Sequence, residues 1–303
     1  MRYSLTIVYT TSRKQPHLSW FYSSLLRKIN PGEHIAVSVI DYYADADSWM
    51  AVDDGVNFLP YEDQITVQRW RCKPTIWQGK YQLPKEPYWA KSAYLNTGIC
   101  RCKTDWLCFV DDRSYLDSHF LQSIREAMDA EYAVCGSYEK RAGMKIEDGE
   151  IVESGTLLGV DTRTPGCYLF DSWYGGSGAL PLEWCLAVNG FNESLCDGLG
   201  SEDSVFGVTL RNSGYPIRYD SKMRLIEDRT PGELDGALKR SDHGISPNDA
   251  SHKIVEMMRD KTTSQNNFDI RNMRDRVLSG EPFPPPTDSP IHWFTGTPIT
   301  DFR

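Results

Sequence analysis

The first half of the chain alternates short apolar runs with amphipathic segments, and this alternation constrains the fold more than any other feature. Leu5 to Thr10 is rich in β-branched residues, and apolar residues then recur at helical spacing from Leu18 to Ile29. Further strands are predicted at 34–42, 65–70 and 106–110, and further helices at 89–99 and 120–128. Such alternation predicts an α/β fold: a mixed, mostly parallel, Rossmann-like sheet flanked by helices, which binds ligands at the carboxyl ends of its strands.

Composition narrows the function classes. The chain has 303 residues, enough for one large domain or two small ones, and 40% of them are hydrophobic. A formal charge of −9 argues against broad electrostatic capture of nucleic acid, although a local basic strip could remain. The eight cysteines lack zinc-site spacing, and no apolar stretch is long enough to span a membrane. We therefore expect reduced thiols and a cytoplasmic protein (in the host cytoplasm if viral) without a transmembrane segment.

An acidic pair follows the predicted strand at 106–110. Asp111 and Asp112 stand at the carboxyl end of that strand, where carboxylates can hold a divalent cation and a nucleotide diphosphate. Two adjacent acids can divide this work, one facing the metal and the other the ribose. A solvated loop, or a cap for the following helix, would show the same pair.

A second acidic pair opens the helix predicted at 201–211. Glu202 and Asp203 can offer a carboxylate base to an incoming hydroxyl group. The same two acids would also stabilise the first turn of a helix that Ser201 caps. Both interpretations fit this segment taken by itself.

The stretch from Gln68 to Trp89 interleaves five basic residues with five aromatic ones. Aromatic faces stack on sugar rings, and the same mixture suits single-stranded nucleic acid. The tryptophans could also simply anchor a surface loop to the core. We interpret the stretch as a lid on the acceptor side, with Trp77 as an acceptor contact.

Three motifs in order carry a family resemblance. Lys91-x-x-x-x-Asn96-x-Gly98, followed by a strand that ends in Asp-Asp, resembles the donor half of family 2 glycosyltransferases, which have the GT-A fold. The segments 173–180, 188–193 and 198–203 resemble the acceptor half and are similar to those of β-1,4-galactosyltransferases. The resemblance covers roughly Ser4 to Ile226.

The resemblance implies a domain organisation and a reaction. A GT-A catalytic domain would span 1–227, with a donor half at about 1–115 and an acceptor half at about 116–227, and 228–303 would be an extension packed on it. The implied reaction is an inverting transfer of a hexose or pentose from a nucleotide-diphosphate donor, with UDP favoured, to an acceptor hydroxyl. The implied donor contacts are Thr10, Thr11, Arg13, Asp41, Lys91, Asn96, Asp111, Arg113, Gly175 and Gly176.

The resemblance also implies catalytic, metal and acceptor residues. Asp203 would be the general base, and Glu202 would hold the acceptor. Asp111, Asp112 and His243 would bind Mn²⁺ or Mg²⁺, with manganese favoured because imidazole suits it better. Acceptor contacts would include Trp77, Trp173 and Tyr174.

One position departs from the family pattern. Arg113 stands where the family usually has an acid. Either Asp112 carries the metal, or Arg113 supplies part of the metal's charge to the diphosphate.

Other functions remain open at this point. A metal-dependent nucleotide-sugar hydrolase could use the same acids, and a non-catalytic sugar- or nucleotide-binding module could retain the motifs. The acceptor could be a saccharide or glycoconjugate, a lipid-linked sugar, a protein or a modified base in viral DNA, although the net charge disfavours nucleic acid. A transferase requires the carboxylates of Asp112 and Asp203 to face each other across one cleft.

Overall fold

The computed structural model describes residues 4–13, 16–44, 48–49, 61, 63–75, 90–161, 173, 176–193, 201–230, 247–266 and 268–284. The chain forms two compact units. The first comprises residues 1–71, 102–183 and 215–237, and the second comprises 72–101, 184–214 and 238–303. Residues 238–303 of the predicted extension 228–303 thus share the second unit with parts of both predicted halves, and the division of the extension from 1–227 stays a prediction.

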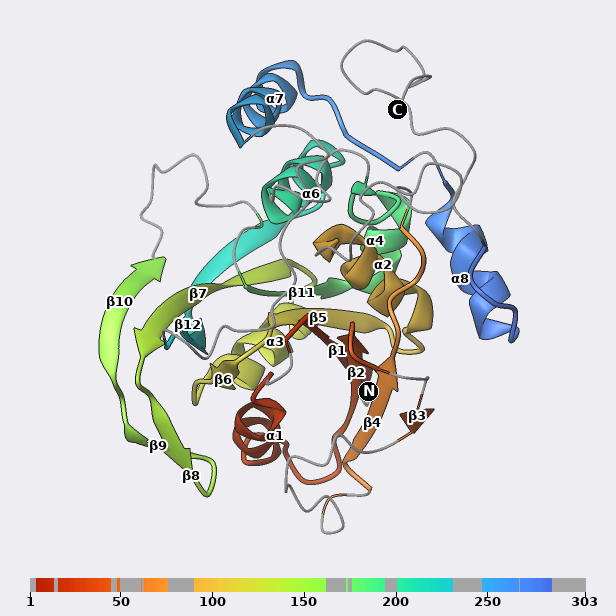
Figure 1. Ribbon diagram of the computed structural model, residues 1–303. Coiled ribbons are helices and arrows are strands. Elements are labelled where there is room, and N and C mark those ends of the chain that lie inside the picture. The colour runs from red at the N-terminus through yellow and green to blue at the C-terminus, as the bar shows by residue number, and fades with distance from the viewer. Residues whose placement is uncertain are drawn as a thin grey trace, which may run out of the picture. The chain divides into compact units, whose positions relative to one another are not determined.

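The parallel part of the sheet lies in the first unit (Figure 1). β1 (Ser4–Thr11) pairs in parallel with β2 (His34–Asp41) on one side and with β5 (Trp106–Asp111) on the other. β4 (Ile65–Trp70) continues the sheet in parallel beyond β2, and β3 (Ser48–Trp49) pairs with it antiparallel. These strands form where the sequence predicts them, because each is a short apolar run rich in β-branched residues.

The other half of the sheet is mixed. β11 (Ser177–Pro181) runs antiparallel between β5 and β7 (Ala133–Ala142), and β12 (Ile217–Asp228) lies parallel to β7. β6 (Ser114–Leu116) pairs with β12, and β10 (Thr156–Asp161) pairs with β7. β8 (Lys145–Glu147) and β9 (Glu150–Glu153) form a separate hairpin around Asp148 and Gly149, both at positive φ. The described strands thus form one ten-stranded sheet and one hairpin.

Helices α1 (Leu18–Leu26) and α3 (Phe120–Asp129) cover one face of this sheet. Their apolar faces pack on alternate strand residues, and this core includes Leu5, Ile7, Tyr9, Ile35, Val37, Val39, Cys108 and Val110. Because successive side chains of a strand point to opposite faces, Thr10 and Asp111 lie on the face away from this core.

The second unit contains most of α4 (Leu182–Ala187) and all of α2 (Lys91–Arg101), α6 (Glu202–Asn212), α7 (Pro247–Asp260) and α8 (Ile270–Leu278). The side chain of Asn266 donates to the carbonyls of Asn189 and Phe191 at 2.7 and 2.8 Å and accepts from the amide of Glu193 at 2.9 Å. The segment before α8 is therefore an integral part of this unit.

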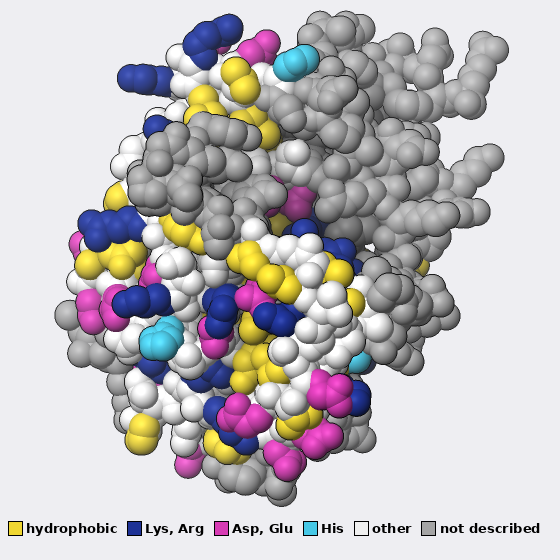
Figure 2. Space-filling model, turned by 90° about the vertical axis from the view of Figure 1, so that its left-hand side faces the viewer, with side chains coloured by type: hydrophobic (Ala, Val, Ile, Leu, Met, Phe, Trp, Pro, Cys, Tyr) yellow, Lys and Arg dark blue, Asp and Glu magenta, His cyan; other side chains and the backbone are white. Residues whose placement is uncertain are grey.

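The face of the first unit that carries the sheet edge at β10 is mixed in charge (Figure 2). Basic and acidic side chains are interspersed there with apolar ones. Ion pairs such as Lys145–Glu153 and Arg224–Asp117 join opposite charges in this unit. The described part of this face presents no broad basic surface of the kind that captures nucleic acid.

Among the described helices, none has the length and apolar character needed to cross a lipid bilayer.

Candidate functional site

Predicted donor residues meet at the carboxyl ends of three neighbouring strands in the first unit. Strand register places Thr10 of β1 beside Asp111 of β5, and Thr11 of β1 beside Asp41 of β2. Arg13 follows β1, and Asp112 follows β5. The sheet therefore gathers these six residues at one edge, as ligand sites in open parallel sheets require.

Asp112 is already bound by the protein. Thr11 Oγ1 donates to its Oδ2 at 2.8 Å, and Arg13 Nε lies 3.1 Å from Oδ1 and 3.0 Å from Oδ2. Burial raises the pKa of Asp112, although Arg13 and Thr11 partly oppose this effect. As a metal ligand, Asp112 would have to exchange these contacts for the metal. Its role as a metal ligand stays a prediction.

Asp41 is held in a similar way. Its Oδ2 accepts from Arg69 Nε at 2.9 Å and from Nη2 at 2.5 Å, while Oδ1 accepts from the amide of Tyr43 at 2.8 Å. Asp41 is buried, whereas a quarter of the Arg69 side chain is exposed. Arg69 was identified in the sequence only as one member of a basic stretch, and its place on the β strand next to β2 brings it to the site.

Arg113 is held inside the protein. Its side chain is completely buried and pairs with the equally buried carboxylate of Asp228. Its Nε also donates to the carbonyl of Asp228 at 3.1 Å. A contact with a diphosphate would require this pair to open, so the donor role of Arg113 stays a prediction.

Asp111 lies against a glycine, on the face of the sheet away from α1 and α3. Its amide donates to the carbonyl of Gly176 at 3.0 Å. A Cβ atom on Gly176 would lie 2.5 Å from the ring of Tyr138 and 3.0 Å from Asp111 Oδ2. Thr10 Oγ1 is buried nearby on the strand paired with β5, and it has no hydrogen-bond partner among the described residues. Only glycine fits at position 176, because any larger residue would displace Tyr138 or Asp111.

Three residues near Asp111 escaped the sequence analysis. The hydroxyl of Tyr138 on β7 donates to the carboxylate of Glu227 near the end of β12, and Glu227 pairs with Arg229. Burial raises the pKa of Glu227, and the charge of Asp111 adds to this increase, so the two acids lie close together. A cluster that depends on the pairing of β7 with β12 has no local sequence signal.

These residues fit a divalent cation that shares its coordination with a diphosphate. Asp111 and Glu227 offer carboxylate oxygens and Thr10 a hydroxyl, all hard ligands of the kind that Mg²⁺ and Mn²⁺ prefer. Within the described part of the chain, no three His, Cys, Asp or Glu residues are grouped as a complete protein-derived metal site. The phosphate oxygens would have to supply the remaining ligands.

In the second unit, Lys91 and Glu202 form an ion pair between the starts of α2 and α6. Lys91 Nζ lies 3.5 Å from Glu202 Oε1, and both side chains are largely buried. Asp203 is half-buried, and its Oδ1 accepts from the amide of Ser204 at 2.7 Å. The predicted base and its neighbour thus stand at the N-terminus of α6, where the helix dipole favours negative charge.

Two of the predicted contacts are buried. Asn96 is fully buried, and its side-chain amide bonds Phe191 and Glu193. Trp173 is also buried, and its indole packs on Gly178 and Phe109. The donor role of Asn96 and the acceptor role of Trp173 stay predictions. The predicted contacts Trp77, Tyr174, Gly175 and His243 lie outside the described residues.

No protein-family profile matches the sequence, and no curated protein is similar to it at a significant level. Solved structures do match the fold. Residues 1–349 of TarS from S. aureus, in complex with UDP, have a TM-score of 0.53 and 10% identity, covering 91% of this chain and 69% of TarS 1–349. GalNAc-T7 with UDP, GalNAc and Mn²⁺ has a TM-score of 0.54 and 11% identity, covering 95% of this chain and 60% of that one. Both are GT-A glycosyltransferases. The chain has the GT-A fold.

The fold class predicted from the sequence is thus confirmed. Thr10, Asp41 and Asp111, which were predicted to contact the donor, lie at the carboxyl ends of β1, β2 and β5. Asp112 belongs to the first unit and Asp203 to the second. The single cleft between these two carboxylates stays a prediction.

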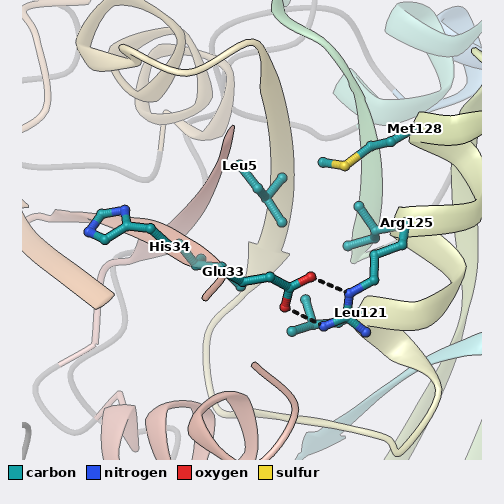
Figure 3. A pocket seen from close by; sticks show the side chains of 8 residues that line it. Leu5, Glu33, His34, Leu121, Arg125 and Met128 are labelled. Atoms are coloured by element: carbon teal, nitrogen blue, oxygen red, sulfur yellow. Dashed lines mark hydrogen bonds and ion pairs between the residues drawn. The ribbon is translucent and has the colours of Figure 1, made fainter. Parts of the chain in front are cut away.

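A small pocket at the opposite ends of the strands has a different character (Figure 3). Leu5, Ile35, Leu121 and Met128 are among the apolar residues that line it, and Arg125 pairs with Glu33 at 2.6 Å on its rim. The pocket lies at the amino ends of β1 and β2, whereas open α/β sheets bind ligands at the carboxyl ends. We therefore do not assign it to the candidate site.

Proposed function

We propose that this GT-A protein is a glycosyltransferase that moves a sugar from a nucleotide-diphosphate donor to an acceptor hydroxyl. The observation that carries the proposal is the arrangement at Asp111. A partly buried carboxylate stands at the end of a parallel strand, against a glycine that leaves no room for a side chain. Beside it lies the Thr10 hydroxyl, which has no hydrogen-bond partner among the described residues. The TarS and GalNAc-T7 structures that share the fold contain UDP, which supports UDP as the nucleotide.

The proposed chemistry is a single displacement. Asp203 takes the proton from the acceptor hydroxyl as its oxygen bonds to the anomeric carbon of the sugar. The bond between that carbon and the diphosphate oxygen breaks, and the nucleoside diphosphate leaves with the electron pair. Attack opposite to the leaving group inverts the anomeric configuration. A base suited to this task must lie within hydrogen-bond reach of the hydroxyl.

The donor side would hold the nucleotide. Thr11, Arg13, Asp41 and Asp112 form a bonded network to which Arg69 adds a guanidinium, and this network is suited to the base and the ribose. Mn²⁺ or Mg²⁺, with manganese favoured, would neutralise diphosphate charge when bound at Asp111 and Glu227. His243 remains a proposed further ligand. Lys91 remains a proposed diphosphate contact.

The first experiment is a thermal-shift screen with UDP-hexoses, UDP-pentoses and GDP-hexoses, each with manganese, with magnesium and with chelator. A ligand that binds only the folded protein raises its melting temperature by mass action. We expect a UDP-sugar to give the largest shift, and a larger one with metal. If no nucleotide sugar shifts the melting temperature under any condition, the proposal is wrong.

The second experiment separates transfer from hydrolysis and from mere binding. Asp203→Asn should abolish formation of glycosylated product while the affinity for UDP stays unchanged, because the base acts on the acceptor. Asp275→Asn, an exposed change in the same unit, is the matched control. Release of free sugar without acceptor-linked product would indicate the hydrolase. Acceptor trials should include saccharides and DNA, since DNA binding would weaken steeply with salt.

A further inference from the structure

Two arginine–carboxylate pairs stand next to each other at the end of β12, and they differ in exposure. Arg113–Asp228 is completely buried, as described above. In the neighbouring pair, Arg229 Nε lies 2.6 Å from Glu227 Oε2, and 37% of the Arg229 side chain is exposed while only 2% of the Glu227 side chain is. The first pair has no surface for a ligand. The second presents its cation to solvent.

The backbone holds Arg229 at the end of β7. The amide of Arg229 donates to the carbonyl of Arg141 at 2.6 Å, next to the last paired residues of β12 and β7. Tyr138, on the same strand β7, donates to Glu227 and packs on the glycine that contacts Asp111. Arg229 is therefore linked to the surroundings of the proposed metal acid through Glu227 and Tyr138.

Arg229 places a positive charge beside Glu227. The charge of Asp111 acts on Glu227, and Tyr138 donates its one hydroxyl proton to Glu227. Among the described residues, Arg229 is the cation that pairs with Glu227. An arginine side chain keeps its charge at neutral pH. If Arg229 turned towards another anion, a cation would have to replace it beside Glu227.

We propose that Arg229 binds the diphosphate of the donor, and that Glu227 holds Arg229 at the site until donor and metal arrive together. This inference rests on the proposed function. A guanidinium can readily change its hydrogen-bond partner from a carboxylate to a phosphate, because its planar donors match both groups. A divalent cation would then take the place of Arg229 beside Glu227. Metal and nucleotide therefore bind cooperatively, and each strengthens the other by the same factor.

The test measures binding, not turnover. Titration calorimetry gives the affinity for UDP and for GDP, with and without Mn²⁺, and electron paramagnetic resonance gives the affinity for Mn²⁺ alone. We expect Arg229→Gln to weaken nucleotide binding by about tenfold or more, the loss of a charge-assisted bidentate contact. The same variant should bind Mn²⁺ alone more tightly than the wild type, because the competing cation is gone. A residue with a merely structural role would not change these two affinities in opposite directions.

Two further variants keep the proposal falsifiable. Arg229→Lys retains the charge and should recover part of the nucleotide affinity, which also covers the case in which Arg229→Gln fails to fold. Arg224→Gln is the matched control: Arg224 lies on the same strand, 41% exposed, and pairs with Asp117 and Glu139. It should leave both affinities unchanged.

The outcomes separate this inference from the proposed function. A wild-type protein that binds neither UDP nor GDP overturns both. A wild-type protein that binds nucleotide, together with an Arg229→Gln variant of equal nucleotide affinity, overturns only the role of Arg229. Loss of nucleotide affinity without a gain in Mn²⁺ affinity overturns the exchange at Glu227.

Discussion

The guanidinium of Arg113 and the carboxylate of Asp228 form an ion pair with no exposure to solvent, although 115 positions separate the residues in the chain. Their backbones also pair, since the amide of Asp228 donates to the carbonyl of Arg113 at 3.0 Å. The pair joins the segment after β5 to the end of β12. It therefore fixes two of the strand ends that carry the acids of the candidate site.

Removing one member of this pair should destabilise the protein strongly. Asp228→Asn leaves a buried guanidinium without its counter-charge, which costs about 3–5 kcal/mol of the free energy of unfolding. Glu153→Gln, in the exposed pair with Lys145, should change the free energy of unfolding far less. Urea denaturation of both variants checks the prediction. Equal effects of the two substitutions would contradict it.

The contact between Gly176 and Asp111 leads to a prediction about donor binding. In Gly176→Ala, the added methyl group would collide with Tyr138 and press on Asp111, so one of the two must move. Overpacking of this kind costs about 1–3 kcal/mol, and we expect the affinity for UDP to fall by about tenfold.

A second glycine provides the control for this substitution. Gly159 has open space around its Cβ position and no positive φ, so Gly159→Ala should leave UDP affinity unchanged. Titration calorimetry with UDP measures the affinity of both variants. Wild-type affinity in Gly176→Ala would remove Asp111 from the donor site.

Asn96 provides a test of a predicted donor contact. Its side chain donates to the carbonyl of Phe191 at 2.8 Å and to Glu193 Oε1 at 2.9 Å, and it accepts from the amide of Phe191 at 2.8 Å. Asn96→Ala should lower the free energy of unfolding by about 2–4 kcal/mol, because these buried groups lose their partner. Asn272→Ala, an exposed change on α8, should have little effect. A stable Asn96→Ala variant that no longer binds UDP would support the donor role.

Local patterns predicted the parallel strands and several helices well. β4 has the predicted bounds, and β1, β2, β5, α2, α3 and α6 lie within two residues or so of theirs. In each of these elements the spacing of the apolar residues is enough to indicate a helix or a strand. Because the carboxyl ends of such strands share one edge, the positions of Thr10, Asp41 and Asp111 followed from the same patterns.

The elements that the sequence analysis missed depend on tertiary pairing. β12 carries charges along most of its length, and a register shift between Asp220 and Arg224 breaks its alternation. β11 lies in a glycine-rich segment without a local strand signal. It is a strand because it pairs with β5 on one side and with β7 on the other. The roles of Arg113 and Glu227 depend on where β12 ends, so no local motif could indicate them.

Lys28 leads to a prediction about pH. Burial lowers the pKa of its ammonium group from 10.5 to about 8, and Asp117 and Glu150 only partly oppose this. Between these two pH values the unfolded chain binds a proton that the folded protein does not, so this group makes the free energy of unfolding rise with pH. The destabilising effect of this group is fully present below pH 8 and disappears as the pH approaches 10.5.

Relative to Lys28→Met, the free energy of unfolding of the wild type should therefore rise by about 1–2 kcal/mol between pH 8 and 10.5, a value reduced for solvent screening at a partly exposed site. Urea denaturation of both proteins from pH 7 to 10.5 measures this gain, and comparison with the variant cancels the titration of tyrosines and cysteines. Parallel stability curves for the two proteins would show that Lys28 titrates normally.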